Sequence, residues 1–542
     1  MKKSVSFLLS MGLIMSLTAC DLFSNEVIDN TNQTNEPVLN VKTTNNTEDP
    51  EKDSSNSKNS TDISDVKDNN PEVMKHIGYS IEKNDFSYWE RNEIGGQDVI
   101  LEAVYDSVKI PEEFPELKKL FDDANMKFEK EYSECHKAFE EGGKESEDVF
   151  PYYYKDRIIV SRADENYFSY LCEVTRGAEG ETEVYYVPYV YNPKTAETVL
   201  WKDILKESDD LYDYITEFLL NNYDKECLFY QDYEQNRQLI ESFFENDEEK
   251  ARYIEVMPDG ADLYFPEALL SPTDMRTIVI PIRYDEHPEF FADSFKVSEE
   301  KDYIRYLPDE FTWYEDIDAD GKRECVSIFE NESYNEIFGE MMYETLEIVP
   351  DGKEEIEIQL GAVENPDIYV GKRGNDIYLF ADMNPRISRL FMIFKLNAES
   401  MTAENVNNCM GDILTLDNFD RIFFAPMLGV FSTFYSSGEY CLDENDKLLC
   451  KEEFTPVYGM DEHPLVTKDR IQGLKVDDKL NVTENKIDVE TGSTLYFRYT
   501  NGTDSVIFEN EDGELILIKR DEEYYIDGKH ETDVFEMLYY YG

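Results

Sequence analysis

Two adjacent segments set the architecture of the N-terminal half: VILEAVYDSVKI at residues 99–110 and, after PEEF, PELKKLFDDANMKFEKEYSECHKAF at 115–139. The first segment alternates apolar and polar residues, which is typical of a half-buried strand. The second places apolar side chains at mostly helical spacing, at Leu117, Leu120, Phe121, Met126, Phe128 and Tyr132. The sequence therefore predicts a strand that leads into an amphipathic helix.

The next segments along the chain are mostly strand-like. Aromatic and β-branched runs predict an antiparallel meander at 157–160, 167–174 and 184–191. Helical spacing returns at 208–222 and 239–244, and closing strands are expected at 262–265 and 277–282. Beyond about residue 300 the runs predict strands joined by tight Asp-Gly turns. The predicted fold class is α+β: an antiparallel sheet with packed helices, followed by mostly β C-terminal units.

Composition and charge limit the classes of function. A chain of 542 residues suggests about three compact units. The sequence has 52 basic and 119 acidic residues, a formal net charge of −67. Such a charge repels phosphate backbones, so we expect no nucleic-acid partner. Apolar residues make up 41% of the chain, which is enough for most of it to fold.

The N-terminus has the order of an export signal. Lys2 and Lys3 precede an apolar run at 5–17, and Leu17-Thr18-Ala19-Cys20 closes it. This arrangement resembles a bacterial lipobox, and the resemblance implies cleavage before Cys20 and a diacylglycerol thioether on its thiol. An ordinary secretory signal is the alternative. We expect a lipoprotein anchored to the cell membrane through lipid and exposed on the extracytoplasmic side.

The sequence predicts five regions. Residues 1–19 form the signal peptide, and 20–72 form the lipidated cysteine with an acidic, disordered tether rich in Asn, Ser and Thr. An α+β domain is expected at 73–298. A β-rich domain at 299–465 and a C-terminal β meander at 466–542 complete the chain.

The α+β region resembles the extracellular domain of RsiV-like anti-sigma factors, which PdaC-like peptidoglycan deacetylases share. The matching pieces are Ile110-Pro111, YVYNPKTAETVLW at 189–201 with Asp203-Ile204-Leu205, and ADLYFPEALLSPTDMRTIVIPI at 261–282. Two local turns depart from the family pattern. Gly177-Ala178-Glu179-Gly180 replaces Gly-Gly-Ala-His-Gly, and Ala196 replaces a turn glycine.

The resemblance implies a binding or spacer module. RsiV-like proteins sense lysozyme through this domain, but their signalling helix and sigma-binding segment are absent from this sequence. PdaC-like proteins carry a zinc deacetylase domain that needs a His-x-x-x-His pair. The five histidines of this chain are all at least fifty residues apart, so we expect no such deacetylase domain.

An acidic loop in the second half has metal-ligand spacing. Alternate carboxylates in DIDADGKRE at 316–324 suit a hard cation such as calcium, and the glycine allows a sharp turn. An EF-hand is excluded because its twelfth position is Ser327. The spacing resembles loops between strands of FG-GAP-like repeats, which implies calcium held by the side chains of Asp316, Asp318, Asp320 and Glu324 and the carbonyl of Lys322. The alternative is an acidic hairpin turn.

Two of the remaining cysteines predict a disulfide. Cys441 and Cys450 flank LDENDKLL, and a hairpin centred on Asn445-Asp446 would place them opposite each other. Two reduced thiols are the alternative. Cys135 and His136 are neighbours on the predicted helix and do not face each other, which argues against a catalytic pair.

We therefore expect a non-enzymatic surface lipoprotein. Its predicted partners are the membrane, through the lipid, and a cell-wall glycan or a cationic protein such as lysozyme. The sequence contains no P-loop, GxSxG, HExxH or CxxC motif, so no catalytic residue is assigned. A cell-wall hydrolase with its active site in the β-rich half is the alternative function. A solute-binding lipoprotein is the third.

Overall fold

The computed structural model describes residues 76–91, 97–142, 152–178, 181–223, 228, 230, 232–244, 253–265, 270, 277–299, 301–308, 311–335, 340–384, 389–460 and 463–540. Residues 74–542 form one compact unit. The predicted signal peptide, Cys20 and the tether lie outside the described residues. Among the residues described, no helix has the length and apolar character needed to cross a membrane.

The expected α+β class is wrong, because the described part of the chain is mostly β. Of the residues that the structure describes, strands account for 53% and helices for 16%, in several sheets. The helices that the sequence predicted do form, but they are few beside the strands. Runs rich in Val, Ile, Tyr and Phe continue over most of the chain, and their β-branched and aromatic side chains favour a pleated surface.

The N-terminal half is built on a six-stranded sheet in the order β1-β3-β4-β5-β6, with β2 also paired to β3. All its pairings are antiparallel except that of β3 with β4, which is parallel. The predicted meander of three strands is therefore present as β4, β5 and β6. The strands are Ser80–Asp85 (β1), Tyr88–Arg91 (β2), Gln97–Lys109 (β3), Tyr152–Ala163 (β4), Phe168–Ala178 (β5) and Glu181–Tyr191 (β6).

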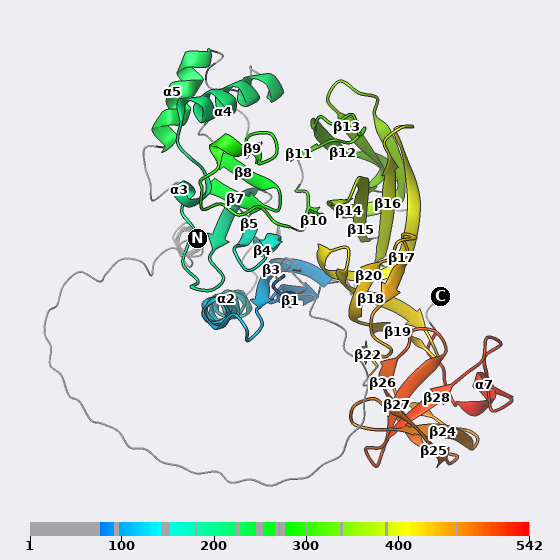
Figure 1. Ribbon diagram of the computed structural model, residues 1–542. Helices are drawn as coiled ribbons and strands as arrows, with labels where there is room; N and C mark the ends of the chain where they lie inside the picture. The colour runs from blue at the N-terminus through cyan, green and yellow to red at the C-terminus, as the bar shows by residue number, and fades with distance from the viewer. Residues whose placement is uncertain are drawn as a thin grey trace, which may run out of the picture. The chain divides into compact units, whose positions relative to one another are not determined.

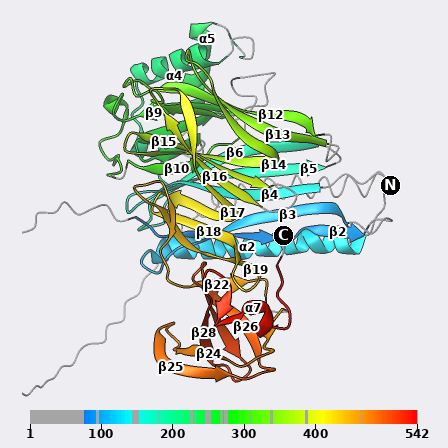
Figure 2. The same cartoon turned by 90° about the vertical axis from the view of Figure 1, so that its right-hand side faces the viewer.

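Helix α2, Pro115–Gly142, connects β3 to β4 and packs on this sheet. Figures 1 and 2 show it running along β3. Its buried residues Leu117, Phe121, Phe128 and Tyr132 repeat at helical spacing, and the ring of Phe121 lies 5.3 Å from that of Phe168 on β5. The helix expected at 115–139 is thus confirmed, and its apolar face explains why it forms here.

A smaller layer follows, in which helices cover a three-stranded sheet. Its elements are α3 (Trp201–Ile204), α4 (Asp209–Asn222), α5 (Tyr233–Phe244), β7 (Ile254–Met257), β8 (Gly260–Phe265), β9 (Ile278–Arg283) and the 3₁₀ helix η2 (Pro288–Phe290). Ser208 caps α4 by accepting a hydrogen bond from the N–H of Leu211. Ala196 has a φ of 56°, so the turn persists in the left-handed region although the family's glycine is missing.

The second half is a continuous antiparallel path from β10 to β28. Its strands are Tyr303–Tyr306 (β10), Thr312–Glu315 (β11), Glu324–Asn335 (β12), Glu340–Pro350 (β13), Ile356–Arg373 (β14), Asp376–Asn384 (β15), Leu390–Asn397 (β16), Thr402–Asn418 (β17), Arg421–Gly429 (β18), Thr433–Ser436 (β19), Gly438–Leu442 (β20), Leu448–Cys450 (β21), Thr455–Tyr458 (β22), Leu465–Val466 (β23), Ile471–Val476 (β24), Val482–Val489 (β25), Thr494–Thr500 (β26), Ser505–Asn510 (β27) and Leu515–Lys519 (β28). The small hairpin β29 (Tyr525–Ile526) and β30 (Lys529–His530) and helix α7 (Glu531–Val534) end it.

Two long strands change partners along their length. The first part of β14 pairs with β13 and its last part with β10 and β15, while β17 pairs first with β16 and then with β18. Gly411 lies where β17 changes partner, and a Cβ there would collide with the carbonyl oxygen of Ala425. Only glycine allows the strands to approach so closely at that point.

One hydrophobic core crosses the predicted boundary at residue 298. It combines Ile159, Leu171, Tyr264 and Val279 from the first half with a larger group from the second that includes Trp313 and Val326. A separate core, which includes Phe497, Phe508 and Phe535, holds the C-terminal strands. The exact domain boundaries stay a prediction.

Candidate metal site

The acidic loop lies at the tip of the hairpin formed by β11 and β12. The register pairs Glu315 with Glu324, so the residues between them protrude from the last strand pair. The backbone enters the left-handed region at Ala319 (φ 58°) and Gly321 (φ 86°). Open space surrounds Gly321, so its backbone conformation, not crowding, favours glycine here.

This loop brings four carboxylates together. Each offers one oxygen, and these oxygens lie within 4.8 Å of one another; they belong to Asp316, Asp318, Asp320 and Glu324. The N–H of Gly321 donates to Asp316 (3.0 Å), and the N–H of Ile317 donates to Glu324 (3.2 Å). The backbone of the loop therefore orients the carboxylates that the sequence singled out.

Lys353, in the turn between β13 and β14, reaches into this cluster. Its ammonium donates to Asp318 and lies 3.5 Å from Asp320 and 3.8 Å from Glu324. One positive charge thus faces three of the four carboxylates. The ammonium occupies the place where a cation would balance their charge.

The electrostatics of the cluster are uneven. The hydrogen bond from Lys353 holds the pKa of Asp318 below its ordinary value. Burial raises the pKa of Glu324, and the neighbouring charge of Asp318 adds to that rise. Among the described residues, Oδ1 of Asp316 is buried and has no hydrogen-bond partner. The lysine therefore satisfies only part of this negative cluster.

Lys322 lies in the same loop, as the sequence predicts. Its N–H donates to Asp320 at 2.9 Å, which helps to shape the turn. The role of its carbonyl as a ligand stays a prediction.

The sequence alone did not indicate the roles of Lys353 and Arg323. Asp351-Gly352 is one of the Asp-Gly turns expected beyond residue 300, and the pairing of β12 with β13 brings it beside the acidic loop. The N–H of Asp351 donates to the carbonyl of Cys325 at 2.9 Å. The alternation of apolar and polar residues in β12 and β13 could have indicated this contact. It implies that the two strands pair as a hairpin, so that the end of β13 lies beside the start of β12, next to the acidic loop.

Arg323 ties the loop to the first half of the chain. Its guanidinium donates to both carboxylate oxygens of Asp285 (2.9 and 3.1 Å) and to Asp259 (3.3 Å), and it lies 3.1 Å from Glu286. Asp259 lies in the turn before β8, and Asp285 and Glu286 lie in the turn after β9. Because Arg323 directly precedes Glu324, the position of the loop and that of this ion-pair cluster are linked.

The predicted Cys441–Cys450 disulfide is wrong in this structure, where both cysteines are free. The hairpin of β20 and β21 forms, but its register pairs Cys441 with Leu449 and Cys450 with Tyr440. The two cysteines are therefore one position out of register. Because side chains alternate between the faces of a strand, their thiols lie on opposite faces.

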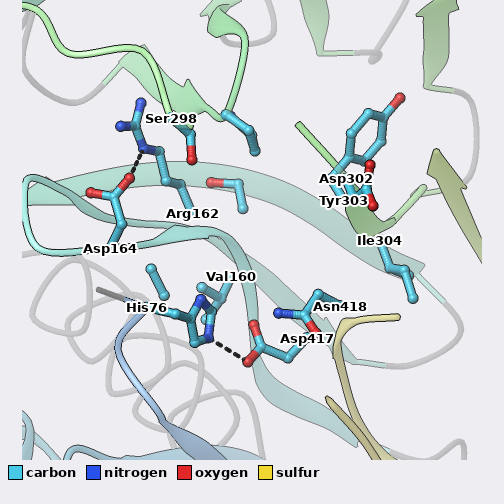
Figure 3. A pocket seen from close by; sticks show the side chains of 13 residues that line it. His76, Val160, Arg162, Asp164, Ser298, Asp302, Tyr303, Ile304, Asp417 and Asn418 are labelled. Carbon is cyan, nitrogen blue, oxygen red and sulfur yellow. Dashed lines mark hydrogen bonds and ion pairs between the residues drawn. The ribbon is translucent and has the colours of Figure 1, made fainter. Parts of the chain in front are cut away.

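A small cavity lies where the segment around His76 meets β4, β10 and the end of β17 (Figure 3). Nε2 of His76 and Oδ2 of Asp417 form a hydrogen bond of 2.7 Å, and Arg162 donates to Asp164 at 2.7 Å. The cavity has a volume of about 40 Å³. That volume has room for a few water molecules at most, so we assign the cavity no ligand.

No protein-family model and no curated protein matches the chain. Several solved structures are similar to part of it, and two of them are DUF3298 family proteins. A DUF3298 family member from Bacteroides fragilis has 12% identity and a TM-score of 0.27, over 41% of this chain and 96% of that one. A DUF3298 family protein from Pseudomonas aeruginosa has 10% identity and a TM-score of 0.26, over 40% of this chain and 96% of that one.

Proposed function

We propose that this chain is a non-enzymatic, extracytoplasmic binding protein, anchored through Cys20, whose loop at 316–324 holds a structural calcium ion. The observation that carries the calcium proposal is the convergence of four carboxylates within 4.8 Å, beside the ammonium of Lys353. Calcium accepts six to eight oxygen ligands in flexible geometry, which suits aspartates on an irregular loop. Magnesium demands a tighter octahedron and should substitute poorly.

The role of the ion is structural in this proposal. A calcium ion would relieve the mutual repulsion of the loop carboxylates and fix the start of β12. Arg323 lies in the same loop and contacts Asp259 and Asp285, so a fixed loop would also hold the contact between the two halves. Nothing in this role requires the ion to touch a substrate.

Calcium should raise the melting temperature of the protein by a few degrees relative to chelator. Binding to the native state alone stabilises it by about 2 kcal/mol at a concentration about thirty times Kd. Asp318→Asn and Glu324→Gln should each reduce this difference, and Asp512→Asn, in an exposed turn elsewhere, should not. The measurement is thermal unfolding at constant ionic strength. If the unfolding curves of the wild type are identical in calcium and in chelator, the loop is an ordinary acidic turn that binds no calcium.

The variant Lys353→Met distinguishes between two explanations of the loop: a metal site, and an acidic turn whose charge Lys353 neutralises. In chelator this variant should melt below the wild type, because three carboxylates lose the ammonium that faces them. Calcium should restore the lost stability, since the ion would then enter without a competing charge. A loss that persists in calcium would mean that the lysine, not a metal, is the cation of this loop.

The proposed ligand is a cell-wall glycan or a cationic protein such as lysozyme. Support for the cationic partner comes from the net charge of −67, which would speed the encounter with a basic protein. The immobilised protein should retain lysozyme at low salt and retain less of it at physiological salt, because ions screen long-range attraction. An acidic protein of similar size is the control. If the immobilised protein retains no lysozyme at either salt concentration, the proposal of a cationic protein partner is wrong.

A further inference from the structure

A groove of about 850 Å³ opens between helix α2 and the edge of the six-stranded sheet. Residues of β1, β3 and α2 line it, and Figure 2 shows α2 running beside these strands. Its volume lies within the range of about 300–1,000 Å³ that is typical of small-ligand sites. The groove is far from the acidic loop in sequence and shares no residue with the metal site.

Two amide side chains in the groove are held in fixed orientations. Nδ2 of Asn84 donates to Oγ of Ser107 (3.0 Å) and to the carbonyl of Glu82 (2.9 Å), and Nδ2 of Asn125 donates to the carbonyl of Val108 (3.0 Å). Within the described part of the chain, these hydrogen bonds leave Oδ1 of each amide available. The groove therefore presents two oriented acceptors, which suit hydroxyl or amide N–H groups.

Aromatic and apolar groups line the same groove. The ring of Phe86 stacks on that of Tyr105, with centroids 6.1 Å apart and planes 16° apart. Met126 lies on the helical wall with 61% of its surface exposed. A sugar ring has an apolar face of C–H groups and a rim of hydroxyls, so it can use both kinds of surface at once.

The groove carries little net charge. Three lysines (Lys109, Lys118 and Lys119) stand against four carboxylates (Glu112, Asp122, Asp123 and Glu129). Lys118 and Asp122 form an ion pair at 2.6 Å across one helical turn. In a chain of net charge −67 this region suits a neutral ligand better than a strongly cationic protein.

We infer that this groove binds a short stretch of a neutral glycan built from N-acetylated sugars. The apolar face of one sugar packs against Phe86 and Met126, and hydroxyl or acetamido N–H groups donate to Asn84 and Asn125. This inference deepens the proposed function and rests on its glycan form.

The test is calorimetric titration of the protein with a soluble tetramer of N-acetylglucosamine, alongside pull-down with insoluble peptidoglycan. Asn125→Ala and Met126→Glu should each weaken tetramer binding at least tenfold. Lys127→Ala, the next residue on α2, is exposed and outside the groove, so it should bind as the wild type does. Unchanged melting temperatures of the variants confirm that each still folds.

The outcomes distinguish the site from the function. If the wild type binds the tetramer and both groove variants bind it equally well, the groove is wrong but glycan binding stands. Binding to peptidoglycan without binding to the tetramer also overturns the groove. If the wild type binds neither, the glycan form of the proposed function fails, and this inference fails with it.

Discussion

Asp262→Asn should lower the free energy of unfolding by about 3–5 kcal/mol, because it removes the buried carboxylate charge to which two buried arginines donate. Asp262 lies on β8, and its carboxylate accepts from Arg283 on β9 (2.5 Å) and from Arg305 on β10 (2.8 Å). All three side chains are almost fully buried. Burial alone would raise the pKa of Asp262, but the two guanidinium groups hold it below its ordinary value.

Urea denaturation at neutral pH measures this loss. Asp209→Asn is the matched control, since Asp209 pairs with Arg237 but is 87% exposed, and such surface pairs contribute about 0–1 kcal/mol. Because Arg305 belongs to the second half of the chain, the variant also tests whether this buried cluster joins the two halves. A loss no larger than that of the control would contradict this role.

Asp382→Asn should make the protein more stable at alkaline pH and flatten its pH dependence. The register places Asp382 on β15 directly opposite Asp367 on β14, and Arg157 engages Asp367 through two hydrogen bonds (2.8 and 3.1 Å). Burial first, and then the charge of Asp367, raise the pKa of Asp382 to about 7. Asp412 and Arg389 also face this carboxyl, with opposite effects on its pKa.

The sign follows from proton linkage. A carboxyl whose pKa is raised in the folded state binds a proton there that the unfolded chain has already lost, so stability falls as pH rises towards and through the folded-state pKa of about 7. Between about pH 5 and pH 8.5, the free energy of unfolding of the wild type should fall by about 1–3 kcal/mol more than that of Asp382→Asn. Burial raises the pKa of Asp106 to about 6, so the stability of Asp382→Asn should still fall with rising pH, but less steeply than that of the wild type.

Urea unfolding at these two pH values is the measurement, with Asp512→Asn as an exposed control. Equal pH dependence in the wild type and Asp382→Asn would show that the carboxyl is ionised in the fold without cost. That result would contradict the description of the cross-strand pair.

The sequence predicted the local elements well. Helical spacing at 208–222 corresponds to α4, Asp209–Asn222, and the acidic loop joins two strands, as the sequence predicted. These features depend on short-range periodicity and turn chemistry, which a single sequence carries. The expected α+β class was wrong because the predicted helices, although present, are few beside long strands such as β14 and β17.

The sequence did not predict which residues far apart in the chain contact each other. Arg157 meets Asp367 across 210 positions, and no local pattern connects them. The approach of Lys353 to the acidic loop depends on the register of β12 with β13, and the cysteine prediction failed through a register difference of one residue. Register is set by the packing of whole strand faces, so a turn motif alone does not determine it.

Calcium titration of the chelator-treated protein by calorimetry tests the central claim most directly. We expect one saturable site with a Kd of about 10⁻⁴–10⁻³ M, the range of extracellular calcium modules. Asp318→Asn should weaken this binding at least tenfold, and Lys353→Met should tighten it because the competing ammonium is gone. A titration without saturable binding in either the wild type or Lys353→Met would contradict the assignment of calcium to the loop at 316–324.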